Sequence, residues 1–125
     1  MLDAVALPSH QRVRGRALAR LDRGRLCDLR QEGSAKVMLP RVFGRAPEVV
    51  FLNTAGGITG GDRLDYRLDL DRGEAVATTQ TAERAYRSAQ GTGRVETHLT
   101  LGPGARLAWL PQELIVFDGA ALDRS

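Results

Sequence analysis

The chain has 125 residues, which is enough for one domain with a buried core. Its 18 basic and 15 acidic residues are interleaved, so no positively charged face predicts a nucleic-acid interface. The single cysteine, Cys27, excludes an internal disulfide framework and a CxxC metal site, and no apolar run approaches the ~18 residues of a membrane span. We therefore expect one domain over residues 1–125, cytoplasmic, with no signal peptide, membrane anchor or bound nucleic acid.

Alternating apolar and polar residues predict β-strands through the first half of the chain. The clearest case is residues 11–21, where arginines share one parity and small or apolar residues share the other, as in a half-buried strand. Glycine and proline mark the intervening turns and loops. The predicted order is a loose stretch at 1–10, a strand at 11–21, a turn at 22–24, an unassigned stretch at 26–29, a turn at 32–34, a strand at 35–39 and a loop at 40–47.

The second half shows the same pattern more sharply. Residues 63–71 alternate without interruption, with leucine or tyrosine on one parity and charged residues on the other. Only residues 81–88 leave two readings open, which are one or two helical turns and an irregular strand. The predicted order is a strand at 48–52, a glycine-rich loop, strands at 62–70 and 74–81, the ambiguous stretch, a loop at 90–93, a strand at 95–101, a turn at 102–104 and two short strands around Pro111.

A weak internal repeat links two of these strands. Four positions recur at an offset of 31 residues: Leu68, Leu70, Gly73 and Val76 correspond to Leu99, Leu101, Gly104 and Leu107. Each copy consists of an alternating strand, a glycine turn and a second strand. The repeat fits stacked β layers, in which each unit covers the apolar face of its neighbour. The predicted fold class is therefore mostly β, with little or no long helix.

The glycine-rich loop, Leu52–Asp62, has two candidate roles, which are a phosphate cradle and a strand-to-strand turn. A phosphate-binding P-loop needs a lysine directly after its last glycine, and Asp62 stands there instead. A strand follows the loop, so no helix N-terminus faces a ligand. We interpret the loop as a turn that needs positive φ and close packing, with a binding role for Asp62 as the alternative. Its glycines are Gly56, Gly57, Gly60 and Gly61.

Few residues of the sequence suggest a metal site or a catalytic site. His10 lies in the loose N-terminal stretch, and His98 has the opposite parity from its apolar neighbours and should be exposed. Two isolated histidines and one cysteine do not predict a preformed metal cage. Glu83, Glu113 and Asp118 could meet in space and act as a hydrolase or isomerase, but ion pairs with nearby arginines are the favoured interpretation.

Three segments in order, residues 52–62, 78–88 and 105–120, resemble the urease accessory proteins of the UreD class, called UreH in some organisms. Residues 31–36 fit the pattern more loosely, and the resemblance extends over roughly residues 12–125. The positions taken to be family-motif or structural residues are Gly56, Gly57, Gly60, Gly61, Asp62, Tyr86, Arg87, Trp109, Pro111, Gln112 and Gly119.

This resemblance implies a non-enzymatic, β-helical scaffold with no permanently bound cofactor. Such proteins act with UreF-class and UreG-class partners to pass nickel into apo-urease, and GTP hydrolysis belongs to the UreG-class partner. Nickel in transit favours exchangeable oxygen and nitrogen ligands over a thiolate cage. The resemblance therefore implies a transient nickel path near Glu83, Gln112, Glu113 and Asp118.

The chain departs from the family in its length, because family members run substantially longer than 125 residues. It resembles an N-terminal portion only. A stack of β layers cut at that point would expose unpaired backbone, so we expect poor solubility or dependence on a partner. The alternative function is a truncated β-rich protein-binding module without urease-maturation activity.

Overall fold

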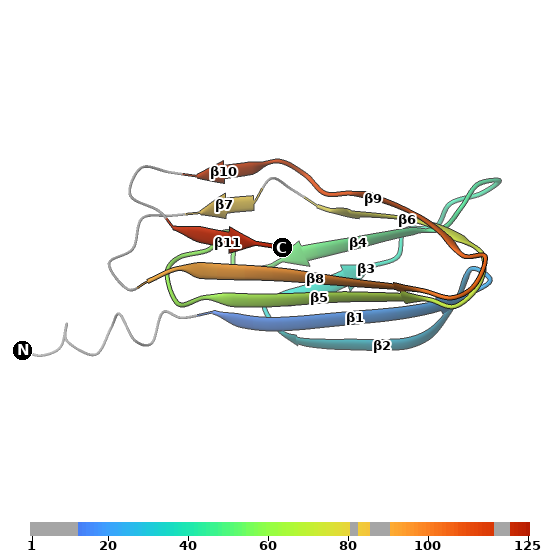
Figure 1. Cartoon of the computed structure of the whole chain (residues 1–125), viewed down its shortest axis with the longest axis horizontal. Coiled ribbons are helices and arrows are strands. Elements are labelled where there is room, and N and C mark those ends of the chain that lie inside the picture. Colours follow the sequence, from blue (N-terminus) through green and yellow to red (C-terminus); the bar gives the residue numbers. More distant parts are fainter. Residues whose placement is uncertain (1–12, 81–82, 86–90, 117–120) are drawn as a thin grey trace, which may run out of the picture.

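The computed structural model describes residues 13–80, 83–85, 91–116 and 121–125. These residues form strands and no helix, which confirms the prediction of a mostly β chain (Figure 1). In the ambiguous stretch at 81–88, the described residues 83–85 are a strand. The strands are β1 (Arg14–Asp22), β2 (Arg25–Gly33), β3 (Ala35–Met38), β4 (Glu48–Asn53), β5 (Arg63–Leu70), β6 (Glu74–Thr79), β7 (Glu83–Ala85), β8 (Gly93–Leu101), β9 (Arg106–Leu110), β10 (Leu114–Val116) and β11 (Leu122–Arg124).

The strands make three sheets. Sheet A has the order β11-β8-β5-β1-β2, sheet B the order β3-β4-β6-β9, and sheet C pairs β10 with β7. The hairpins β1–β2 and β3–β4 are antiparallel. From β4 onward the chain moves to a different sheet with every strand. Each later strand except β7, whose partner β10 follows it, pairs in parallel with an earlier one. This arrangement shows mixed sheets, and the β-helical stack that the resemblance implies stays a prediction.

The internal repeat corresponds to real strand pairing. Leu68 lies opposite Leu99 and Leu70 opposite Leu101, so the 31-residue offset is confirmed for β5 and β8. In the second strand of each copy the register slips by one residue, because Val76 lies opposite Ala108 and not Leu107. The slip follows from the turns: three residues separate β5 from β6, whereas four separate β8 from β9.

The core lies between sheets A and B. Along β1 and β5 alternate side chains are buried, as the period-two pattern predicts. Phe51 of sheet B and Tyr66 of sheet A stack with ring centroids 4.9 Å apart, and Trp109 meets Phe51 edge-on at 6.3 Å. Each of the two fully buried rings contributes about 1.5–3 kcal/mol through burial alone. The aromatic cluster therefore ties the two sheets together.

The edge strands of sheet A differ from the expectation. The sequence leaves 26–29 unassigned, but β2 runs for nine residues and pairs with β1 along most of its length. Almost every β2 residue is exposed, so no apolar face imposes alternation on its sequence. At the other edge, β11 has only three residues, paired with Gly93–Val95, and no pattern predicts it.

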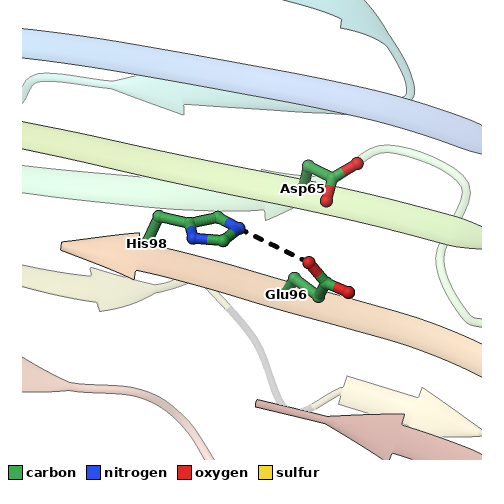
Figure 2. A group of neighbouring side chains, drawn as sticks. All are labelled: Asp65, Glu96 and His98. Carbon is green, nitrogen blue, oxygen red and sulfur yellow. Dashed lines mark ion pairs between the residues drawn. The ribbon is translucent and has the colours of Figure 1, made fainter.

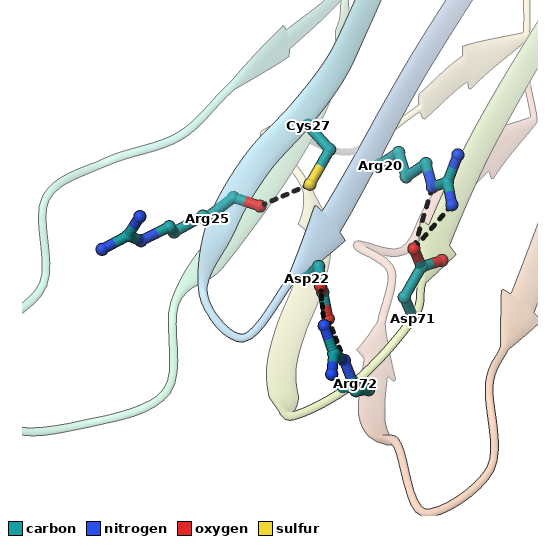
Figure 3. A network of polar contacts seen from close by, with 6 residues as sticks. All are labelled: Arg20, Asp22, Arg25, Cys27, Asp71 and Arg72. Carbon is teal, nitrogen blue, oxygen red and sulfur yellow. Dashed lines mark hydrogen bonds and ion pairs between the residues drawn. The ribbon is translucent and has the colours of Figure 1, made fainter.

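Two ion pairs join the end of β1 to the turn that follows β5 (Figure 3). Arg72 donates from Nε to Asp22 Oδ1 at 2.8 Å and from its terminal nitrogen to the other oxygen. Arg20 donates to Asp71 Oδ2 through two nitrogens, at 3.0 and 2.7 Å. Each pair links residues about 50 positions apart in the sequence, so both brace the parallel β1–β5 pairing at the point where the two strands end.

The Asp22–Arg72 pair makes stability depend on pH. The hydrogen bond from Arg72 lowers the pKa of Asp22 below its usual value of 3.8. A carboxylate with a lowered folded-state pKa stabilises the fold above its unfolded pKa and loses that contribution as pH falls through the folded value. We expect Asp22→Asn to lower the thermal midpoint at pH 7 by at most about 3 °C, because solvent screens an exposed pair. Circular-dichroism melts at pH 7 and near pH 2.5 measure the effect.

The difference between Asp22→Asn and the parent chain should shrink toward zero at the lower pH. Asp28→Asn is the matched control, since Asp28 pairs with Arg30 at 3.4 Å within the same strand and does not bridge two strands. An Asp22→Asn effect of equal size at both pH values would contradict the expectation.

Candidate functional site

The three segments that suggest a family meet at one end of the molecule, where β4, β6 and β9 finish (Figure 1). Phe51 of β4 lies opposite Thr79 of β6, and Thr78 lies opposite Leu110 of β9. We call this region the motif end, and it comprises the loop 53–62, the last residues of β6 and β9, and strands β7 and β10. Parallel pairing brings these segments together because it aligns strand ends from successive parts of the chain.

Within the motif end, the glycine-rich loop is a tight turn that its own polar groups hold in place. The Asn53 side chain accepts from Ala55 N at 3.0 Å and donates to Gly57 O at 3.1 Å. Gly56 and Gly61 have φ values of 82° and 86°, a region that residues with a Cβ rarely adopt. The predicted need for positive φ is therefore confirmed at these two glycines. Gly60 is buried.

Asp62 is the buried anchor of this loop. The residue is 3% exposed, and its two carboxylate oxygens accept from Val13 N at 2.7 Å and from Thr59 N at 2.8 Å. Its own carbonyl accepts from Arg94 N at 2.9 Å. One residue thus joins the start of β1, the glycine-rich loop and β8. Both side-chain oxygens bind main-chain donors, and this arrangement gives Asp62 a structural role.

The third segment is attached to the second through threonine hydroxyls. Thr78 Oγ1 donates to Leu110 O at 2.6 Å, and Gln112 N donates to Thr79 Oγ1 at 2.9 Å. Arg124 donates to Gln112 O at 3.0 Å, which connects β11 to the same place. These contacts fix the chain on both sides of Pro111, where β9 has ended and β10 has not begun.

The structure brings two of the predicted nickel-path segments side by side. Strand β7 pairs in parallel with β10, and Glu83 lies opposite Leu114, the residue after Glu113. The side chain of Glu113 is exposed. Asp118 lies outside the described residues, as do Tyr86, Arg87 and Gly119. The nickel path through Glu83, Glu113 and Asp118 therefore stays a prediction.

One group of candidate ligands was missed by the sequence reasoning. His98 is exposed, as predicted, but it is not isolated, because its Nε2 lies 3.4 Å from Glu96 Oε2 with Asp65 close by (Figure 2). Two features of the sequence could have indicated this group. Glu96 and His98 are two residues apart on one predicted strand, and the 31-residue offset of the repeat links Asp65 to Glu96. His10 lies outside the described residues.

Comparison with known proteins identifies the family. The model of the UreD urease accessory protein family matches residues 10–125. The chain belongs to the UreD family. It is 72% identical over 124 residues to the urease accessory protein UreD of Jannaschia sp. (strain CCS1), and 55% identical over 125 residues to that of Paracoccus denitrificans. It is also 47% identical over 129 residues to the UreD of Rhizobium rhizogenes.

Each of these alignments covers 99% of the chain but only 45–47% of the relative. The chain therefore spans about half the length of the curated UreD proteins it matches. In the part of the chain that the structure describes, no helix has the length and apolar character needed to cross a bilayer.

Proposed function

We propose that the chain is part of a non-enzymatic scaffold for urease maturation. In this role it acts in the cytoplasm with UreF-class and UreG-class proteins, docks on apo-urease and supports the insertion of nickel. The proposal is carried by one observation: the chain belongs to the UreD family. The convergence of its three family segments at the motif end adds support. Most of the bonds described there use main-chain groups and neutral side chains, with Asp62 as a buried anchor and Arg124 as a charged donor to a main-chain carbonyl, which is typical of a structural junction.

Nucleotide chemistry belongs to a partner in this proposal. The loop with glycines at 56, 57, 60 and 61 leads into a strand, and Asp62 occupies the position where a P-loop has its lysine. The Asp62 carboxylate is negative and already accepts two main-chain hydrogen bonds. We therefore assign GTP hydrolysis to the UreG-class protein and the docking surface to this chain.

The parallel pairing supports a β-helical continuation in the longer protein. Strand β8 pairs beside β5 at an offset of 31 residues, and β9 pairs beside β6 at an offset of 32. In sheet B as described, β9 is an edge strand, so a further pair of strands in the longer protein could continue the same arrangement beside it. Leu110 on β9 is 59% exposed, and Leu101 on β8 is 43% exposed. Further circuits would cover these side chains and extend the surface offered to partners.

For the nickel path we retain Glu83, Glu113 and Asp118 as candidate transient ligands. Glu83 begins β7, Glu113 directly precedes β10, and these two strands pair at the motif end. Glu113 is exposed. Carboxylates exchange divalent ions quickly, which suits an ion that must be handed on and not retained.

The test is reconstitution with the proposed partners. We expect the untagged 125-residue chain, co-expressed with UreF-class and UreG-class proteins and apo-urease, to be retained when tagged urease is purified. Glu83→Gln combined with Asp118→Asn should leave retention unchanged and lower both urease activity and bound nickel by about tenfold, because the path loses its carboxylates. Activity assays and elemental analysis of the purified urease give the two readouts.

Glu74→Gln is the matched control, because Glu74 is an exposed acid on β6 that makes only a long contact of 3.9 Å with Arg106 among the described residues. The UreD of Jannaschia sp. serves as the full-length comparison. Failure of the chain to be retained on any partner would favour a β-rich binding module without a urease role. Wild-type activity and nickel content in the double variant would remove the carboxylate path.

A further inference from the structure

A histidine and two carboxylates share the outer face of sheet A, on strands β5 and β8. Asp65 of β5 lies directly opposite Glu96 of β8, and His98 follows two residues later on the same face (Figure 2). We propose that Asp65, Glu96 and His98 form a binding site for a divalent transition-metal ion of the zinc, cobalt and nickel class.

The distances suit such an ion. The candidate ligand atoms of the three residues all lie within 4.8 Å of one another. His98 Nε2 and Glu96 Oε2 are 3.4 Å apart. Two ligands that each lie about 2.1 Å from a tetrahedral ion are separated by roughly 3.4 Å, so this pair already has the required spacing. The Asp65 oxygen lies within 4.8 Å of both other ligand atoms, so a change of its side-chain rotamer would complete the set.

The donor set selects the class of ion. Two carboxylates match the charge of a divalent cation, and a neutral imidazole is a preferred ligand of zinc, nickel and copper but not of magnesium or calcium. The side chains of Asp65, Glu96 and His98 are 20%, 31% and 60% exposed. They border a hollow of about 600 Å³, which leaves room for water as the remaining ligands.

Arg63 is the competitor for this position. Like charges directly opposite each other across two strands repel, so Asp65 and Glu96 need a cation between them. Arg63 supplies it, with Nε 3.2 Å from Asp65 Oδ2 and a terminal nitrogen 3.7 Å from Glu96 Oε2. The hydrogen bond and charge of Asp65, with the charge of Glu96, raise the pKa of Arg63 above its usual value. A metal ion must displace this guanidinium, which predicts modest affinity and gives the proposal a distinctive test.

The inference does not depend on the role in urease maturation, and its test needs only the chain itself. Zn²⁺, Co²⁺ and Mg²⁺ are titrated calorimetrically into the untagged 125-residue chain carrying Cys27→Ser, which removes the exposed thiol. We expect one saturable site for Zn²⁺ and Co²⁺ and none for Mg²⁺. His98→Gln should weaken binding about tenfold or more, and Arg63→Gln should strengthen it about threefold or more, because the competing cation is lost.

His10→Gln is the matched control, since His10 and His98 are the two histidines of the sequence. It should leave the affinity unchanged. Circular dichroism verifies that each variant is folded, which is expected for substitutions on the exposed face of a sheet. The absence of saturable binding overturns the proposal, as does an unchanged affinity in His98→Gln or a weaker one in Arg63→Gln.

Discussion

Replacing Asp62 with alanine is expected to lower the free energy of unfolding by about 3–5 kcal/mol. Asp62 is 3% exposed, and its carboxylate accepts from Val13 N and Thr59 N. Its removal leaves both main-chain donors without their acceptor, and each unsatisfied buried group costs about 1–3 kcal/mol. Urea denaturation followed by circular dichroism measures the change, and protease sensitivity reports it if the variant is largely unfolded.

Asp69→Ala is the matched control for this substitution. Asp69 pairs with Arg67 on the solvent face of β5 at 3.1 Å, so its loss should cost no more than about 1 kcal/mol. Asp62→Asn should fall between the two, because an amide can accept one of the two hydrogen bonds but presents a donor to the other. A cost below about 1 kcal/mol for Asp62→Ala would show that the buried carboxylate does not anchor the loop.

The second large effect is expected at Gly33, the last residue of β2. Its φ is 62°, and a Cβ placed there would collide with the carbonyl oxygen of Arg14 on the paired strand. Left-handed backbone costs a residue with a Cβ about 1–2 kcal/mol, and the collision with rigid backbone adds to it. We expect Gly33→Ala to destabilise the chain by about 3 kcal/mol or more in urea denaturation.

Gly44→Ala separates the two causes. Gly44 has a similar φ of 69°, but an added Cβ would meet nothing within 4 Å. It should therefore cost only the conformational part, about 1–2 kcal/mol. Equal losses for the two alanine variants would mean that the close approach of β2 to Arg14 contributes nothing.

The sequence predicts best those strands that have one buried face and one exposed face. In β5 every second residue between Leu64 and Leu70 is buried, so the pattern of the sequence and the pattern of burial coincide. The interpretation of the glycine-rich loop as a turn also follows from local chemistry, because Asp62 replaces the lysine that a phosphate site needs. These features are set by neighbours in the sequence.

The features that the sequence does not predict depend on partners distant in the chain. Strand β2 is exposed on both faces, so its nine residues carry no alternation. Asp65, Glu96 and His98 are unremarkable separately, and only the β5–β8 register makes them a group. For the candidate path, the structure adds that the strand containing Glu83 pairs with the strand directly after Glu113.

The order of strands in the sheets has a consequence for the time course of folding. Sheet A reads β5, β8, β11 outward from β1, and sheet B reads β4, β6, β9, so each parallel strand adds beside one that was synthesised earlier. Each new pairing of β5 with β8 or β6 with β9 closes a loop of about 30 residues, which makes it slow compared with the local β1–β2 hairpin. A ribosome adds 30 residues in about 2–6 s. Each strand can therefore be paired in its sheet before the strand that will pair beside it is synthesised. The direction of translation is then also the direction in which the sheets grow.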